Sequence, residues 1–195
     1  GMVSILASEK RLRDALISKD LYFAAAQPLY PDCEDVGMFR NPQPIPETKT
    51  WMVLGGSDNY TRPEPCVELG KKIKANGGDI IVDVRKGWVH DFIGNWKVEI
   101  SKYSQIFWKC PKYYTEDDGK MNKSYVDWLV EYVDRWETQE DMYKMSREDP
   151  LRALKFSFDP YNLSGCMFTG AKTGGDKGNQ IMNTTIKFWV ENLLK

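Results

Sequence analysis

The sequence predicts an α/β fold with a short, mainly parallel sheet flanked by helices, and three consecutive segments carry this prediction. Thr50–Gly56 is a continuous apolar run that stops at two glycines, as a buried strand does. Cys66–Gly78 follows two prolines, is amphipathic and ends in Asn-Gly-Gly, which is typical of a helix. Asp79–Val84 is a second apolar run. A strand, a helix and a strand in this order form a βαβ unit, whose two strands run parallel.

The residues before this unit predict two further elements. Met2–Ser18 places apolar residues on a helical pattern, although no clear N-cap opens it. Leu21–Pro31 is an apolar run that ends at prolines and predicts a short buried strand. Phe39–Thr50 holds three prolines and predicts an extended surface connection. We therefore expect a sheet of three strands.

The residues after the unit are less regular, and we expect 95–180 to form a helical insertion or cap before the last helix. Within it, Lys123–Trp136 predicts an amphipathic helix. Its inward face is expected to hold Tyr125, Trp128, Leu129, Tyr132, Val133 and Trp136. Ile181–Lys195 predicts the closing helix. Its inward residues are expected to be Ile186, Trp189, Val190 and Leu193. Phe168–Asn179 is rich in glycine but lacks the ending of a phosphate-binding loop.

The composition is that of a globular domain. The 195 residues are 42% hydrophobic, so we expect 2–195 to form a single domain, with Gly1 as the remnant of a tag. A formal net charge of −1 gives no reason to expect nucleic acid as a partner. The sequence has no run of eighteen apolar residues and no signal-peptide layout at its start, so we expect no membrane partner and a cytoplasmic protein.

Cysteine and histidine usage argues against a metal site or a cofactor. The four cysteines are widely spaced and form no C-x-x-C pair, and the chain has one histidine. We therefore expect no metal and no cofactor. Because a disulfide framework is uncommon in a chain of this length, we expect Cys33, Cys66, Cys110 and Cys166 to be buried or half-buried free thiols in a reducing compartment.

The single histidine, His90, and an aspartate, Asp58, follow the two strands of the βαβ unit. Because the carboxyl ends of neighbouring parallel strands meet at one edge of a sheet, we expect these two side chains to come within reach of each other. In acyl-transfer hydrolases a carboxylate fixes the tautomer of a histidine, which takes a proton from the nucleophile. Taken alone, however, an aspartate after a glycine turn more often stabilises the turn. A lone histidine is likewise more often a surface or core residue than a catalyst.

The segment LGGSDNYTRPEPC, which contains Asp58, closely resembles the acid loop of the dienelactone hydrolase family, and RKGWVHDF, which contains His90, resembles that family's histidine loop. FAAAQPLYPDC is similar to the strand and turn before the acid loop, IKFWVENLL to the last helix, and Cys166 to a late cysteine of these chains. The resemblance covers Met2–Phe92 and Ile181–Lys195. It implies a partial α/β-hydrolase fold that acts on a carboxylic ester or lactone. In it Asp58 would be the triad acid and His90 the general base.

The third member of such a triad is missing from the sequence. The family's nucleophile lies in G-x-S-x-G or its cysteine version, and neither motif occurs. Ser57 is on the acid's own loop, Cys166 comes after the histidine, and Ser4 has no flanking glycines. The resemblance therefore implies the carboxyl-terminal half of a hydrolase, truncated or inactive, whose nucleophile lies upstream. Leu21–Tyr30 would then be an exposed sheet edge, so we expect a homodimer or higher homo-oligomer formed along it.

Two other interpretations stay open. In the first, the chain is a non-catalytic binding or assembly module built on a hydrolase scaffold. In the second, it is a structural domain in which Asp58 and His90 merely bond to the backbone. A separation between these two side chains far beyond hydrogen-bond reach, about 3 Å, favours the structural domain.

Overall fold

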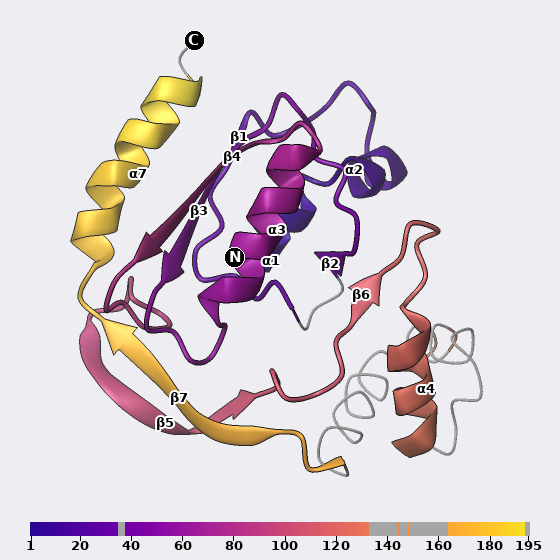
Figure 1. Ribbon diagram of the computed structural model, residues 1–195. Coiled ribbons are helices and arrows are strands. Elements are labelled where there is room, and N and C mark those ends of the chain that lie inside the picture. Colours follow the sequence, from indigo (N-terminus) through magenta and orange to yellow (C-terminus); the bar gives the residue numbers. More distant parts are fainter. Residues whose placement is uncertain (35–37, 133–143, 145–147, 149–163, 194–195) are drawn as a thin grey trace. The chain divides into compact units, whose positions relative to one another are not determined.

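The computed structural model describes residues 1–34, 38–132, 144, 148 and 164–193 (Figure 1). Among these residues no helix is long and apolar enough to cross a membrane. The chain divides into two compact units. The first comprises Gly1–Cys33, Asn41–Ser104 and Gly170–Lys195, and the second comprises Glu34–Arg40 and Gln105–Thr169.

The first unit is built on a three-stranded parallel sheet with the strand order β1-β3-β4. β1 (Ala25–Ala26) pairs with β3 (Lys49–Gly55), which pairs along its whole length with β4 (Asp79–Arg85). α3 (Pro63–Ala75) connects β3 to β4. The parallel pairing of β3 with β4 confirms the predicted βαβ unit. The sequence could predict it because apolar runs, a proline at a helix start and glycine stops are all local signals.

α3 packs on one face of this sheet. Its buried residues recur at three- and four-residue spacing, as on one side of a helix: they are Pro63, Cys66, Leu69, Gly70 and Ile73. Gly70 lies so close to β4 that a Cβ atom there would collide with the side chain of Val82. The helix is thus held at short range against the strand that it precedes.

α7 (Gly178–Leu193) packs on the opposite face (Figure 1). Ile181 joins a core cluster with Trp51 and Val53 of β3, and the ring of Phe188 lies 5.5 Å from that of Trp51. The predicted inward face is wrong at three positions, which are about half exposed: Ile186, Val190 and Leu193. Helical periodicity located α7, but the contacts of Ile181 and Phe188 set its rotation about its own axis.

The predicted helix Met2–Ser18 is instead two short helices, α1 (Met2–Leu6) and α2 (Lys10–Leu16). Glu9 separates them. Its carboxylate accepts a hydrogen bond from the backbone N–H of the second residue of α2 and another, at 2.8 Å, from Gln43 N–H. Glu9 is buried while it makes these bonds, so it acts as the N-cap of α2 rather than as a residue of one longer helix.

The predicted strand Leu21–Pro31 is shorter than expected. Beyond β1 it makes one isolated parallel bridge, between Leu29 and Val53. Pro28, which lies between β1 and this bridge, has no N–H to donate to a ladder. The three large apolar residues that precede β1 are largely exposed: Leu21, Tyr22 and Phe23.

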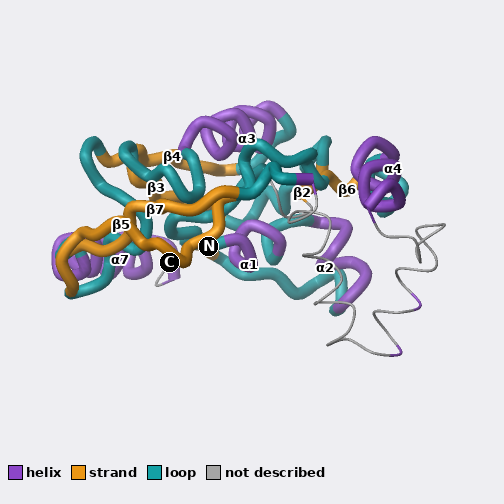
Figure 2. The backbone as a smooth tube through the Cα atoms, turned by 90° about the horizontal axis from the view of Figure 1, so that it is seen from below, coloured by secondary structure: helices purple, strands orange, loops and turns teal. Residues whose placement is uncertain are grey.

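The segment 95–180, for which we predict a helical insertion, contains strands as well as a helix. β5 (Trp96–Ile106) pairs with β7 (Phe168–Gly175) in a separate two-stranded sheet, and the two strands lie side by side in both views (Figures 1 and 2). The helical prediction is wrong for these strands. Apolar and polar residues alternate at the start of β5, and this pattern is typical of a strand rather than of a helix.

Within the first unit β5 and β7 run antiparallel. A Cβ atom on Gly174, near the end of β7, would meet Trp96 at the start of β5, whereas one on Gly170 would approach Ile100 further along β5. The registers therefore advance in opposite directions. This arrangement brings residues 170–175 back beside the loop that follows β4, where His90 forms an isolated bridge with Thr173.

The second unit contains β2 (Met38–Phe39), which pairs in parallel with β6 (Tyr114–Thr115), and α4 (Lys123–Tyr132). The predicted inward residues of α4 include three that are buried or half-buried: Tyr125, Trp128 and Leu129. The burial of a fourth predicted residue, Tyr132, is not described, and the last two predicted positions, Val133 and Trp136, lie outside the described residues.

The expectation of free thiols is wrong, because the four cysteines form two disulfides. Cys33 is bonded to Cys66 in the first unit, and Cys110 to Cys166 in the second, with Cα atoms 5.0 Å apart in each pair. The paired residues are 33 and 56 positions apart, so folding alone makes them neighbours. Disulfides persist in oxidising surroundings, and cysteine usage therefore gives no support to a reducing compartment.

Candidate active site

The loops that follow β3 and β4 are fastened to each other through their backbones. Gly56 N–H donates to the carbonyl of Arg85 at 2.8 Å, and Ser57 N–H donates to the carbonyl of Trp88, also at 2.8 Å. Gly55 makes this approach possible, because a Cβ atom there would lie 2.7 Å from the Trp88 carbonyl oxygen. The acid loop and the histidine loop thus leave the same edge of the sheet as one connected structure.

Asp58 and His90 are in direct contact at this edge. Asp58 Oδ2 lies 2.9 Å from His90 Nδ1, and the exposed fractions of the two side chains are 1% and 11%. The prediction that neighbouring parallel strands bring these side chains within reach is confirmed. The distance does not favour the interpretation in which both residues merely bond to the backbone.

The carboxylate of Asp58 has a second function in the local fold. Its Oδ1 accepts hydrogen bonds from Tyr60 N–H at 2.8 Å and Thr61 N–H at 2.9 Å, which closes the turn before α3. One oxygen therefore holds the turn while the other faces the imidazole. The turn fixes the carboxylate in the orientation that His90 needs.

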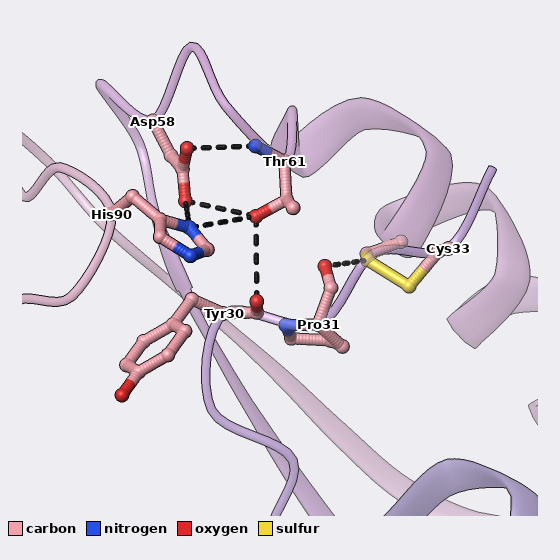
Figure 3. Close-up of a disulfide and its surroundings, with 7 residues drawn as sticks. Tyr30, Pro31, Cys33, Asp58, Thr61 and His90 are labelled. Atoms are coloured by element: carbon pink, nitrogen blue, oxygen red, sulfur yellow. Dashed lines mark hydrogen bonds and ion pairs between the residues drawn. A yellow bond between two sulfur atoms is a disulfide. The ribbon is translucent and has the colours of Figure 1, made fainter. Parts of the chain in front are cut away.

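Thr61 is a third polar residue at the site, and the sequence did not assign it a role. Its Oγ1 lies 3.0 Å from Asp58 Oδ2, 3.0 Å from His90 Nδ1 and 3.3 Å from the carbonyl oxygen of Tyr30 (Figure 3). The available signal was an aromatic-Thr pair two residues after Asp58, which formed part of the family resemblance. Spacing alone does not show that a threonine hydroxyl turns towards the histidine.

These contacts determine which imidazole nitrogen carries the proton. An ionised carboxylate only accepts hydrogen bonds, so Asp58 Oδ2 requires a donor on His90 Nδ1. In the neutral ring the other nitrogen, Nε2, then keeps its lone pair. Among the described residues none forms a hydrogen bond with Nε2. The arrangement provides an oriented, aspartate-paired base.

Two tyrosine rings flank the imidazole edge-on. The ring centroids of Tyr30 and Tyr60 lie 4.8 Å and 4.6 Å from that of His90. Burial raises the pKa of Tyr30, and the charge and hydrogen bond of Asp91 raise it further. Burial also raises the pKa of Tyr60, with added contributions from nearby aspartates. Both phenols therefore stay neutral beside the histidine at physiological pH.

The backbone around His90 is held in an uncommon conformation. Tyr30 and Asp91 have φ angles of 36° and 57°, the two positive values among the non-glycine residues that the structure describes. Such conformations cost free energy and cluster at functional sites, where the surrounding contacts enforce them. Here one of these residues packs against the imidazole and the other directly follows it.

β7 ties the two loops together from outside. Gly174 N–H donates to the carbonyl of His90 at 2.9 Å. Asn59, next to Asp58, accepts a bond from Lys172 N–H at 2.7 Å and donates to the Gly170 carbonyl at 3.2 Å. Neither β7 nor Asn59 was predicted to belong to the site, since the contacts of Asn59 join residues more than a hundred positions apart and Gly174 is likewise distant from His90 in the chain.

The structure places none of the three considered nucleophiles against the imidazole. Ser57 is exposed and Ser4 lies in α1. Cys166 is in the second unit and is bonded to Cys110, so it has no thiol to offer. In the described part of the chain no group of three or more His, Cys, Asp and Glu side chains is placed to hold a metal ion.

The fold and the site define an α/β protein with a buried Asp–His acid–base pair at the carboxyl edge of a parallel sheet. No family model, curated protein or solved structure matches the chain. The function is therefore argued from the geometry of Asp58 and His90 and from the residues around them.

Proposed function

We propose that Asp58 and His90 are the acid and the general base of a hydrolase triad of the dienelactone hydrolase type, which cleaves a carboxylic ester or a lactone. The observation that carries the proposal is the buried 2.9 Å contact between Asp58 Oδ2 and His90 Nδ1, in loops that leave adjacent parallel strands. The resemblance of both loops to that family supports the same assignment. We also propose that the parallel sheet and its helices are part of an α/β-hydrolase fold.

In the proposed mechanism His90 Nε2 accepts the proton of a serine or cysteine nucleophile as the Oγ or Sγ atom of that residue attacks the ester carbonyl. The imidazolium that forms is stabilised by the Asp58 carboxylate, and Nε2 then returns the proton to the leaving oxygen as the acyl enzyme forms. In the second half of the reaction Nε2 takes a proton from water, which attacks the acyl carbonyl, and returns it to the nucleophile as the carboxylic acid leaves. The sequence has no G-x-S-x-G or equivalent cysteine motif. The nucleophile and its oxyanion donors are therefore proposed to come from residues outside these 195.

The first experiment measures hydrolysis of a simple, unactivated aryl ester, such as phenyl acetate, by the purified chain. We expect no rate above the buffer blank, because the proposal places the nucleophile and the oxyanion hole, each of which supplies a large part of such catalysis, outside these 195 residues. His90→Ala is the matched control. A His90-dependent turnover contradicts the proposal that the nucleophile lies outside the chain.

The second experiment asks whether the complete reading frame encodes G-x-[SC]-x-G before Met2. If it does, the full product should hydrolyse esters or lactones, and Asp58→Asn and His90→Ala should each abolish most of that rate. If the frame has no such motif and its product folds without activity, the hydrolase assignment for this protein is wrong.

A non-catalytic binding or assembly module is the second candidate function. It is favoured by one observation, that none of the described residues offers a nucleophile to His90 Nε2. An inert and well-folded product of the complete reading frame is the result that selects this candidate.

We also propose that the chain forms a homo-oligomer through the sheet edge at β1. β1 is a two-residue edge strand, and its outer side has no strand partner in the described residues. The apolar residues leading into it are exposed, and exposed edges invite pairing with another chain: they are Leu21, Tyr22 and Phe23. Light scattering should show a dimer or larger species that dissociates when Phe23 is changed to Lys. A stable monomer at high concentration contradicts this.

A further inference from the structure

We infer that the hydroxyl of Thr61 is a positioning group for His90, which acts with Asp58 to keep the proton on Nδ1 and the lone pair on Nε2. The inference deepens the proposed function, because the catalytic use of this tautomer rests on that function. Thr61 lies three residues after Asp58, just before the first turn of α3, and its side chain is turned towards the imidazole (Figure 3).

The hydrogen bonds around Thr61 Oγ1 are limited by which of its neighbours can donate. The hydroxyl has a single hydrogen. Two of its neighbours, Asp58 Oδ2 at 3.0 Å and the Tyr30 carbonyl at 3.3 Å, only accept hydrogen bonds. When Nδ1 carries a hydrogen, the hydroxyl hydrogen points to one of these two acceptors, and the lone pairs of Oγ1 remain for His90 Nδ1 at 3.0 Å.

The contact with the Asp58 carboxylate makes Nδ1 the donor. If Nδ1 carries a hydrogen, Asp58 Oδ2 and Thr61 Oγ1 share it. The hydroxyl hydrogen of Thr61 is then available to the Tyr30 carbonyl, so that all four atoms have a partner. Without a hydrogen on Nδ1, the imidazole lone pair would face a carboxylate oxygen at 2.9 Å, and three acceptors would compete for one hydroxyl hydrogen. Asp58 Oδ2 thus selects the Nδ1–H tautomer, and Thr61 Oγ1 adds a second acceptor to it; this is the tautomer that a general base needs.

The hydroxyl is separable from the part of Thr61 that builds the turn. The turn uses the backbone N–H, which donates to Asp58 Oδ1 at 2.9 Å. Thr61→Val keeps that bond and nearly the same shape while it removes the hydroxyl, and Thr61→Ser keeps the hydroxyl while it removes the methyl group. A purely structural role predicts no change in the imidazole tautomer in either variant.

The test is nitrogen NMR of the imidazole at a pH where the ring is neutral. His90 is the only histidine, so its two ring nitrogens are read without assignment ambiguity. We expect a single Nδ1–H tautomer in the wild type and in Thr61→Ser. In Thr61→Val we expect a mixture, with a clearly measurable Nε2–H population.

The matched control is Thr48→Val, which removes another threonine hydroxyl from a buried residue of the same unit. Thr48 Oγ1 donates to the carbonyl of Phe23 at 2.7 Å and makes no bond to His90. The control should leave the wild-type tautomer unchanged. Thr61→Ala is measured beside Thr61→Val, so that a folding failure of one variant does not remove the test.

Two results overturn the inference. Thr61→Val and Thr61→Ala with the wild-type tautomer would mean that Asp58 fixes the ring alone, and a mixture in Thr61→Ser would mean that the methyl group matters instead of the hydroxyl. The measurement uses no substrate, so it separates this inference from the proposed function. A tautomer shift in an otherwise inert complete protein would keep the role of Thr61 and remove the hydrolase.

Discussion

Gly55 lies against the backbone of Trp88, close enough that a Cβ atom on Gly55 would stand 2.7 Å from the Trp88 carbonyl oxygen. Gly55 ends β3 and Trp88 lies two residues before His90. This close approach brings the acid loop against the histidine loop, and the hydrogen bond from Ser57 N–H to the same carbonyl reinforces it.

Gly55→Ala should therefore force the two loops apart. The obstructing atoms belong to the backbone and cannot rotate away, so we expect a loss of about 1–3 kcal/mol in the free energy of unfolding and a displaced His90 NMR signal. The control is Gly77→Ala, at the far end of α3. Gly77 has a φ of 89° with open space around it, so this variant should lose stability while its His90 signal stays in place. Equal displacement in both variants contradicts the assignment.

Asp58→Asn should invert the imidazole tautomer. The asparagine oxygen still accepts the bonds from Tyr60 and Thr61 N–H, but its NH₂ group then faces His90 Nδ1, which must accept. We expect the Nε2–H form in NMR and a loss of about 1–3 kcal/mol from the disturbed buried network, measured by urea unfolding. Asp79→Asn, at an exposed ion pair with Lys49, should change stability by no more than about 0.5 kcal/mol. An unaltered tautomer in Asp58→Asn contradicts the pairing.

Removing the Cys33–Cys66 disulfide should destabilise the first unit. The bond closes a 33-residue loop, and the double variant Cys33→Ser/Cys66→Ser should lose about 2–4 kcal/mol of unfolding free energy. The bond joins the turn after Tyr30 to the first turn of α3, so the His90 signal should also broaden or shift (Figure 3). Cys110→Ser/Cys166→Ser, in the second unit, is the control and should leave that signal unchanged. Non-reducing peptide mapping that finds four alkylated thiols would contradict both bonds.

Stability should fall at alkaline pH because of Tyr30 and Tyr60. Their pKa values are raised above the ordinary 10.0 in the folded state, mainly by burial. Above about pH 10 the unfolded chain therefore releases protons that the folded chain still holds, and the free energy of unfolding decreases as pH rises. Urea unfolding between pH 8 and pH 11 should show a shallower decrease in Tyr30→Phe and in Tyr60→Phe. Tyr22→Phe, at an exposed tyrosine, is the control, and identical slopes in all three variants contradict the prediction.

Some errors of the sequence-based predictions share one cause. The apolar residues of the last helix were identified, yet Ile186, Val190 and Leu193 are exposed, because the packing of Phe188 on Trp51 decides which side turns inward. The glycine-rich segment 168–179 lacks the ending of a phosphate-binding loop, but its pattern does not indicate the strand that binds Asn59 and His90. In each case the deciding contact joins residues far apart in the chain.

The amino-acid sequence by itself determined the parallel βαβ unit and the meeting of Asp58 with His90. Both follow from local signals: apolar runs that end at glycines, and a helix whose length carries the chain back to the edge where β3 begins, so that both strands end at the same edge. Only the tertiary structure decided the disulfide partners, the support from β7 and the turn of the Thr61 hydroxyl towards the imidazole. These features depend on which distant segments lie beside each other, and the residue pattern of a single segment does not show this.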